Sequence, residues 1–211
     1  MTDKLAFPPR AFFKSDASDD ALFYEEPRLV NHIDDQAIAA LTNFYRERLP
    51  AGGRLLDLMS SWVSHLPPDV DYSEVLGLGM NAVELAANSR LTRWWVQDLN
   101  VNARLPLEDV SVDAATIAVS IQYLEHPIAV LADIKRVLVP GGPLIVSFSD
   151  RCFPTKAVAI WLSLDTFDHA RLVTLYSRHA GFASAEEHML INGHASDPLM
   201  VVVARKAAEA A

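Results

Sequence analysis

Cysteine is nearly absent from this sequence of 211 residues, in which Cys152 is the single example. One cysteine allows neither a disulfide within the chain nor a cluster of thiolates that could bind zinc. Positive charge is also scarce, since 18 Lys and Arg stand against 27 Asp and Glu and give a formal net charge of -9. Without a basic block to follow a phosphate backbone, we expect no nucleic-acid partner.

Long apolar runs are missing as well. No stretch approaches the roughly 20 apolar residues that span a bilayer, and no basic segment followed by an apolar core marks a signal peptide. We therefore expect a cytoplasmic protein with no membrane partner. The remaining composition, with 51% hydrophobic and 21% charged residues, is ordinary for a globular domain and indicates no particular oligomeric state.

The chain is predicted to consist of an N-terminal arm with a helix (residues 1–50), a main domain (51–205) and a short tail (206–211). Prolines and a Ser/Asp run interrupt the first 30 residues, so we expect an irregular arm held by its aromatic side chains, which are Phe12, Phe13, Phe23 and Tyr24. Asp34 or Asp35 then caps a helix with apolar residues at helical spacing up to Leu49.

Strand patterns alternate with helix patterns through the main domain. Strands are predicted at 54–58, 74–78, 94–96, 113–120, 144–148, 183–190 and 199–204, and helices at 81–88, 127–138, 157–164 and 166–180. This alternation is typical of βαβ units in a mostly parallel sheet. Right-handed crossovers then place helices on both faces.

Three motifs in the second half of the chain resemble those of a known family. They are Tyr123-Leu124-Glu125-His126-Pro127, then Leu138-Val139-Pro140-Gly141-Gly142 before an apolar strand, and Ala180-Gly181-Phe182 before the sixth strand. Pro140 cannot continue a helix, and the two glycines permit a tight reversal into the strand. Over residues 52–205 the chain resembles the class I S-adenosylmethionine-dependent methyltransferases of the small Rossmann-like, methyltransferase type 11 kind.

The resemblance implies an α/β fold: a Rossmann-like, mostly parallel seven-stranded sheet with an antiparallel last strand, helices on both faces and a covering N-terminal arm. It implies S-adenosylmethionine as cofactor and a small-molecule methyl acceptor. Asp57 takes the place of the acid closing the first strand, near the methionine moiety, and Asp98-Leu99 that of the pair reading the adenine. The full set of implied cofactor contacts is Asp57, Ser60, Ser61, Gly79, Met80, Asn81, Asp98, Leu99 and Ser120.

Two departures from the family pattern concern the cofactor. Met59, Ser60, Ser61 and Val63 occupy a loop that is usually rich in glycine, where side chains fill space that the cofactor needs. Gly79 stands where the family carries the acid that binds the ribose hydroxyls. Asn81 is the nearest polar candidate for that task.

The acceptor side is predicted from residues that the frame brings near the strand ends. His32, His65 and Tyr123 are the candidate bases, and the candidate substrate contacts are Arg28, Trp62, His126 and Arg151. The alternatives are structural: His32 and His65 as surface residues, His126 as a plain residue before Pro127, and Arg151 paired with Asp150 or Asp165. The scattered histidines and acids fit no metal spacing.

Two other functions remain open at this stage. Gly77-Leu78-Gly79-Met80-Asn81-Ala82 matches the dinucleotide fingerprint G-x-G-x-x-A, with Asp98 about 20 residues further on, and so allows an NAD(P)-binding protein. The missing glycines and ribose acid allow a non-methylating descendant that binds or regulates, since fold does not fix function.

Overall fold

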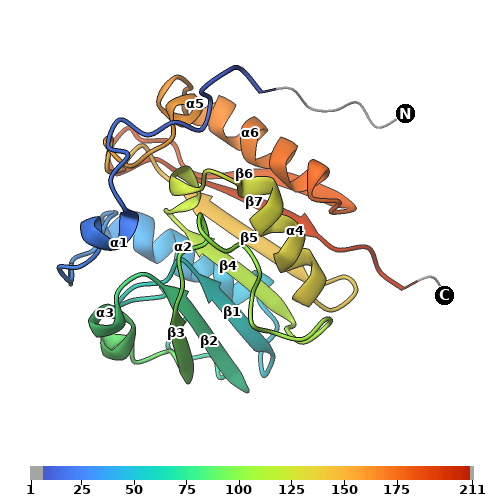
Figure 1. The fold of residues 1–211 in the computed structure, drawn as a ribbon. Coiled ribbons are helices and arrows are strands. Elements are labelled where there is room, and N and C mark those ends of the chain that lie inside the picture. The colour runs from blue at the N-terminus through green and yellow to red at the C-terminus, as the bar shows by residue number, and fades with distance from the viewer. Residues whose placement is uncertain (1–6, 210–211) are drawn as a thin grey trace.

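The seven strands form a single sheet with the order β3-β2-β1-β4-β5-β7-β6 in the computed structural model, which describes residues 7–209 (Figure 1). Strands β1 to β5 run parallel, and β7 is antiparallel to both β5 and β6. The predicted Rossmann-like class and its antiparallel last strand are confirmed. The strands are β1 (Arg54–Leu58), β2 (Glu74–Gly79), β3 (Arg93–Val96), β4 (Ala114–Ala118), β5 (Pro143–Phe148), β6 (Ser184–Ile191) and β7 (Leu199–Arg205).

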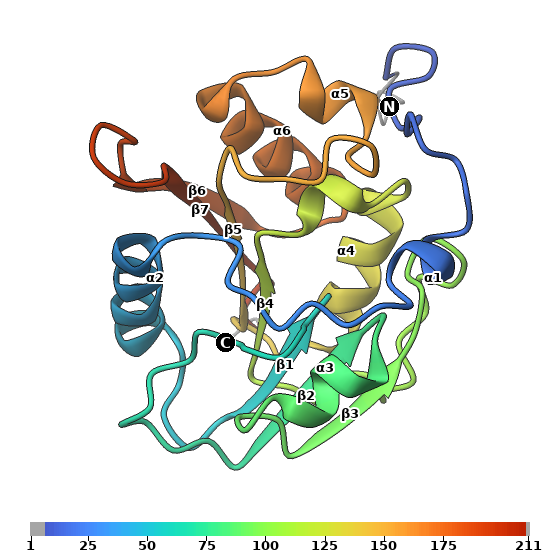
Figure 2. The same ribbon diagram turned by 90° about the vertical axis from the view of Figure 1, so that its left-hand side faces the viewer.

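Helices cover both faces of the sheet, as predicted (Figure 2). On one face α2 (Asp35–Arg48) packs Leu41 and Tyr45 against Leu55 and Val201. On the other face α4 (Pro127–Val137) and α6 (Thr166–His179) pack against the alternate side chains of the same strands, such as Leu56. Central strands such as β5 are buried along their whole length, which explains their continuous apolar sequences.

The helix boundaries follow from capping. Asp34 is the N-cap of α2, where its Oδ1 accepts a hydrogen bond from Ala37 N at 2.9 Å. Pro127 lies in the first turn of α4, where its missing N–H costs nothing. The remaining helices are short: α1 (Asp20–Phe23), α3 (Ala82–Ala87), α5 (Ala159–Leu162) and the 3-10 turn η1 (Ile121–Tyr123).

Residues 59–73 connect β1 to β2 as a loop. Two segments differ from the prediction. The fourth strand ends at Ala118 because Val119 adopts a positive φ of 44°. The predicted helix 157–164 shrinks to α5, since the amides of Ala159 and Ile160 donate instead to carbonyls of the arm.

The N-terminal arm packs on the domain through most of its aromatic side chains. Phe12 contacts Tyr176 of α6, and Phe23 lies edge-on to Phe153 at 5.3 Å between ring centroids. Phe13 is the exception, because it is 59% exposed. Residues 1–6 of the predicted arm and 210–211 of the predicted tail lie outside the described residues.

Candidate functional site

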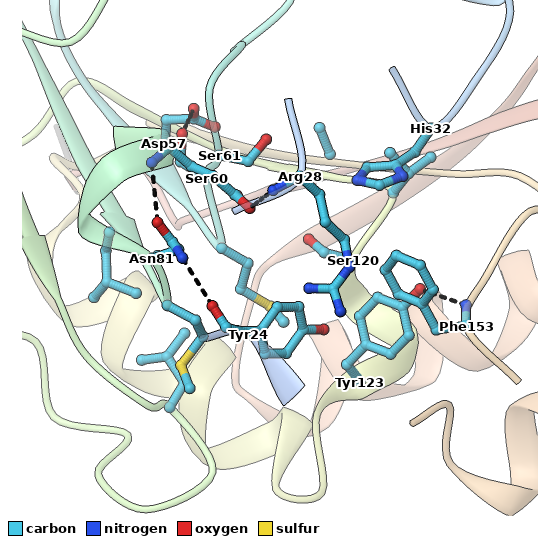
Figure 3. A pocket seen from close by; sticks show the side chains of 18 of the residues that line it. Tyr24, Arg28, His32, Asp57, Ser60, Ser61, Asn81, Ser120, Tyr123 and Phe153 are labelled. Atoms are coloured by element: carbon cyan, nitrogen blue, oxygen red, sulfur yellow. Dashed lines mark hydrogen bonds between the residues drawn. The ribbon is translucent and has the colours of Figure 1, made fainter. Parts of the chain in front are cut away.

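A pocket of about 280 Å³ lies where the carboxyl ends of β1 to β5 face the arm. This is the place where open α/β sheets bind their ligands. The strand order makes the pocket extend from the residues after β3, at one side, to those after β5, at the other. The arm lines the pocket with residues between Asp20 and His32, among them Tyr24, Arg28 and His32 (Figure 3).

The structure brings most of the predicted site residues together. The pocket is lined by Arg28, His32, Asp57, Ser60, Ser61, His65, Gly79, Met80, Asn81, Asp98, Leu99, Ser120, Tyr123 and Arg151. Trp62 and His126 do not line it. The Trp62 indole donates to the carbonyl of Val30 at 3.0 Å and so fastens the arm, while His126 is exposed and precedes α4 without making a capping bond.

Asp57 organises the loop after β1 from the inside. Its carboxylate accepts hydrogen bonds from the hydroxyls of Ser60 and Ser64, both at 2.6 Å, and of Thr116 at 2.9 Å. Burial raises the pKa of Asp57, and these three hydrogen bonds oppose that rise. Both carboxylate oxygens of Asp57 are therefore engaged within the protein. Asp57 positions the loop after β1 through its hydrogen bonds to Ser60 and Ser64.

The loop keeps a backbone conformation that glycine usually supplies. Met59 has a φ of 53°, in the left-handed region that side chains disfavour. Ser60 N then donates to the carbonyl of Leu78 at 2.7 Å, which lays the loop against the end of β2. A Cβ on residue 79 would overlap the carbonyl oxygen of Ser60, so this close approach requires Gly79.

Asn81 is fully committed within the protein. Its Oδ1 caps α3 by accepting from Val83 N and Glu84 N, at 2.9 and 3.1 Å, and its Nδ2 donates to the carbonyls of Tyr24 and Glu25. These bonds use both lone pairs and both protons of the amide. Asn81 therefore joins α3 to the arm and has no capacity left for a ribose hydroxyl, contrary to the role predicted for it.

Glu84 is an acidic pocket residue that the sequence reasoning missed. It lies in the first turn of α3, is 7% exposed, and accepts the backbone N–H of Arg28 on its Oε1 at 2.6 Å. No residue between 7 and 209 donates to its Oε2. The signal was available, because Asn81-Ala82-Val83-Glu84 has the spacing of a capping box; here the glutamate turns to the arm.

His32 and His65 line the pocket as neutral imidazoles. Burial, and then the charge of Arg28, lowers the pKa of His32; burial, and then His32, lowers the pKa of His65 to about 4. The His32 ring lies edge-on to Phe153, 5.4 Å between centroids, which places it toward the β5 side. A neutral imidazole can accept a proton, so His32 remains a candidate base. The pKa of about 4 makes His65 a weak base at neutral pH.

Tyr123 fits the role of a base poorly. Its hydroxyl accepts the backbone N–H of Phe153 at 2.9 Å, and burial raises the pKa of the phenol to about 12. It therefore stays protonated at neutral pH. Ser120, the N-cap residue of η1 three positions before Tyr123, is 8% exposed, and its buried Oγ has no hydrogen-bond partner among the described residues.

A buried ion-pair network holds the arm over the pocket. The side chain of Lys156 is only 1% exposed, and its Nζ lies 3.2 Å from carboxylate oxygens of Asp16 and Asp20 and 2.8 Å from the carbonyl of Ser18. Lys14 forms a further ion pair with Asp20. No local pattern indicates this network, because Lys156 lies about 140 residues from its partners in the arm.

The loop after β5 contributes Arg151 and Cys152 to the pocket. Arg151 is paired with neither Asp150 nor Asp165; its nearest acid is Asp197, at 3.8 Å, and its side chain is 65% exposed. Burial raises the pKa of the Cys152 thiol, which makes a thiolate nucleophile unfavourable.

Between residues 7 and 209 no group of three or more His, Cys, Asp and Glu side chains is arranged to hold a metal ion. Within that same part of the chain, no helix is both long and apolar enough to cross a membrane.

Comparison with known proteins agrees with this architecture. A family model described as a methyltransferase domain matches residues 61–146, from the loop after β1 into β5. No curated protein matches the chain by sequence. The resemblance to class I S-adenosylmethionine-dependent methyltransferases is confirmed by this match and by the solved structures that share the fold.

Three of these structures illustrate the likeness. An S-adenosylmethionine-dependent methyltransferase from Mesorhizobium loti is 19% identical, with a TM-score of 0.54 over 80% of this chain and 98% of its own. One from Aquifex aeolicus is 16% identical, with a TM-score of 0.59 over 81% and 90%. The (4+2)-cyclase SpnF is 19% identical, with a TM-score of 0.61 over 80% and 81%. At these identities the comparison shows a common fold.

Proposed function

We propose that this chain, which has the fold of the class I S-adenosylmethionine-dependent methyltransferases, transfers a methyl group from S-adenosylmethionine to a small-molecule acceptor. The observation that carries the proposal is the layout of the pocket described above. Asp98 and Leu99 line it at the β3 side, and His32 lies at the β5 side against Phe153. The pocket thus offers an acid and an apolar side chain to a cofactor and a candidate base to an acceptor.

The residues present fit the cofactor with one rearrangement. Asp98 accepts Asn100 N on Oδ1 at 2.7 Å and receives no donor on Oδ2 from residues 7–209, so it can accept from the adenine amino group. The end of β2 offers no free acid, because Gly79 is covered by Ser60 and Asn81 is committed. Glu84 lines the pocket and is the first carboxylate after Gly79 in the sequence, so it is our candidate for binding the ribose hydroxyls. Ser61 and Ser120 remain for the methionine moiety.

When bound, S-adenosylmethionine supplies the methyl group on a sulfonium. The chain has to hold donor and acceptor in line and to exclude water, which the arm does by closing the pocket. His32 can take a proton from an acceptor that must lose one, because its imidazole is neutral at physiological pH. His65, with a pKa of about 4, is a weak base for this step. Tyr123 keeps its proton and can donate a hydrogen bond.

Isothermal titration calorimetry with S-adenosylmethionine and S-adenosylhomocysteine tests the proposal. We expect both to bind the wild-type protein, and Asp98→Ala to weaken both about tenfold or more, as expected for the loss of a hydrogen bond to a charged group. His32→Gln and His65→Asn should bind like wild type and lower only turnover. Absence of binding at millimolar ligand would refute the cofactor assignment.

A non-methylating binding or regulatory protein is the second candidate. It is favoured by the side chain of Met59 in the loop after β1 and by the committed Asn81, and one structural neighbour of the fold is itself named a cyclase. It predicts cofactor affinity without methyl transfer to any acceptor. The NAD(P) alternative loses its main argument, since Gly77 and Gly79 make room for Leu91 and Ser60 within the protein.

A further inference from the structure

The guanidinium of Arg28 lies in the pocket without an acidic partner. It donates to the backbone carbonyl of Phe23 at 2.8 Å and more weakly to that of Glu26 at 3.4 Å, and no carboxylate among residues 7–209 pairs with it. Figure 3 shows the side chain extending from the arm into the pocket. A guanidinium has five N–H donors, so three of them have no acceptor from the described residues.

The position of this cation is nevertheless fixed. The backbone N–H of Arg28 is bound by Glu84, and the guanidinium carbon lies 4.4 Å from the ring centroid of Phe23 and 5.4 Å from that of Phe153. The aromatic faces stabilise the cation but leave its charge uncompensated. A held guanidinium with free donors is suited to bidentate recognition of a planar anion.

The four acids among residues 7–209 that line the pocket, which are Asp20, Asp57, Glu84 and Asp98, form no ion pair with Arg28. Asp20 is neutralised by Lys14 and Lys156, and both oxygens of Asp57 accept from hydroxyls. The Ser120 hydroxyl, buried and without a partner, lines the same pocket and can donate to the same ligand. A cation and an unused hydroxyl in an aromatic pocket select a carboxylate.

We propose that Arg28 forms the centre of a carboxylate-binding subsite. The proposal rests on the proposed function for its two candidate sources, which are the carboxylate of the cofactor's methionine moiety and a carboxylate on an aromatic acceptor. The shared chemistry is a planar anion that accepts the free N–H groups of Arg28. Arg28→Gln removes the charge and keeps most of the stem, whereas Arg28→Lys keeps the charge and loses the fork.

The first pair of probes tests the cofactor as source. S-adenosylhomocysteine carries the methionine-derived carboxylate, and 5′-methylthioadenosine lacks it. If the cofactor supplies the anion, Arg28→Gln weakens S-adenosylhomocysteine about tenfold or more and leaves 5′-methylthioadenosine unchanged in calorimetry. Arg171→Gln, which removes an equal charge from the exposed ion pair with Asp168 on α6, is the matched control.

The second pair tests the acceptor as source, with benzoate and its neutral analogue benzamide titrated into protein saturated with S-adenosylhomocysteine. If the acceptor supplies the anion, Arg28→Gln loses benzoate binding, keeps that of S-adenosylhomocysteine and shows no preference for benzoate over benzamide. Either pattern supports the subsite. Equal losses for charged and neutral probes, or no loss for any probe, would overturn it.

Failure of the proposed function is recognised separately. If wild-type protein binds neither S-adenosylhomocysteine nor 5′-methylthioadenosine, the cofactor assignment fails, and the benzoate and benzamide titrations on the free protein then decide the subsite. Benzoate binding that depends on Arg28 still supports it, and binding that is absent or independent of Arg28 overturns it. Unchanged melting temperatures of the variants establish that they are folded.

Discussion

The carbonyl oxygen of Ser60 occupies the space that a Cβ on residue 79 would need. The loop after β1 and the end of β2 are therefore one unit, joined also by the bond from Ser60 N to the carbonyl of Leu78. An acid cannot stand at position 79 while the loop follows this path. The missing ribose acid and the glycine-poor loop, two separate departures in the sequence, have one structural cause.

Gly79→Ala should be costly because backbone has to move to admit the methyl group. We expect the free energy of unfolding to fall by about 3 kcal/mol in urea denaturation, at the upper end for overpacking, and the affinity for S-adenosylhomocysteine to fall with it. Gly52→Ala is the control: Gly52 has a φ of 73° but nothing within 4 Å of an added Cβ. It should cost only the backbone strain, about 1 kcal/mol. Equal costs would contradict the contact between Ser60 and position 79.

Thr116→Val should show how much one of the three hydroxyl groups that donate to Asp57 contributes to the stability of the fold. The substitution keeps the shape and leaves Oδ1 of a buried carboxylate without its donor, so we expect a loss of about 2 kcal/mol in unfolding free energy. Thr174→Val removes a similar hydroxyl that donates to Glu187, whose side chain is exposed and can be hydrated instead. A smaller loss is expected there, and the reverse order would refute the argument.

His65 should make the protein less stable in mild acid. Its pKa is about 4 in the folded state, against about 6.5 for an unperturbed histidine, so well above pH 6.5 both states are neutral and His65 costs no stability. Between pH 6.5 and about 4 the unfolded state is protonated at His65 and the folded state is not. The free energy of unfolding therefore falls by up to roughly 3 kcal/mol as the pH is lowered. His32, whose pKa is also lowered, acts in the same direction.

Urea unfolding from pH 7 to pH 4.5 measures this dependence. His65→Asn should flatten it, because asparagine does not titrate and tolerates the positive φ of 53° at this position. An equally steep decline in the variant would show that His65 is not its source.

Lys156→Met should loosen the arm. The substitution removes the buried ammonium from Asp16 and Asp20, and breaking a buried pair costs about 3 kcal/mol or more. Hydrogen exchange should show lost protection in residues 7–32 before the sheet is affected. Arg171→Met, which breaks an exposed ion pair of 2.7 Å, should change little. Undiminished protection of the arm would show that its aromatic contacts suffice to hold it.

Glu84→Gln should weaken recognition of the ribose hydroxyls while keeping an acceptor for Arg28 N. We expect wild-type protein to bind adenosine more tightly than 2′-deoxyadenosine or 3′-deoxyadenosine, and the variant to lose at least one of these preferences. Changing Glu84 in the protein and one hydroxyl in the ligand forms a double-mutant cycle. The cycle separates the contact between the two groups from general effects of the substitution on stability. Unaltered preferences would remove Glu84 from the cofactor site.

The fold was largely readable from the sequence because it depends on local patterns. Continuous apolar runs such as that of β5 predict buried strands, Asp34 predicts a cap, and Pro140-Gly141-Gly142 predicts a reversal. The location of the pocket followed, since parallel strands bring their carboxyl ends to one edge. Asp57, Asp98 and Ser120 lie in the pocket because they stand at or just after the carboxyl ends of parallel strands.

What the sequence did not reveal depends on contacts between distant segments. Lys156 reads as a solvated residue beside a short helix, and only the folded arm supplies its acids. In the sequence Asn81 has the look of a free amide. Its hydrogen bonds to the carbonyls of Tyr24 and Glu25, which precede it by 57 and 56 residues, form only in the folded protein. Tyr123 reads as a candidate base until its burial is known.

The arm both carries Arg28 and His32 and closes the pocket over them. A ligand that engages these side chains therefore adds its own contacts to those between Asp20 and Lys156, and nothing so held can leave until both sets have separated. We therefore expect tight binding and slow dissociation to vary together. We expect the residence time of a ligand to lengthen with the stability of the arm, and the opening of the arm to limit the rate of turnover.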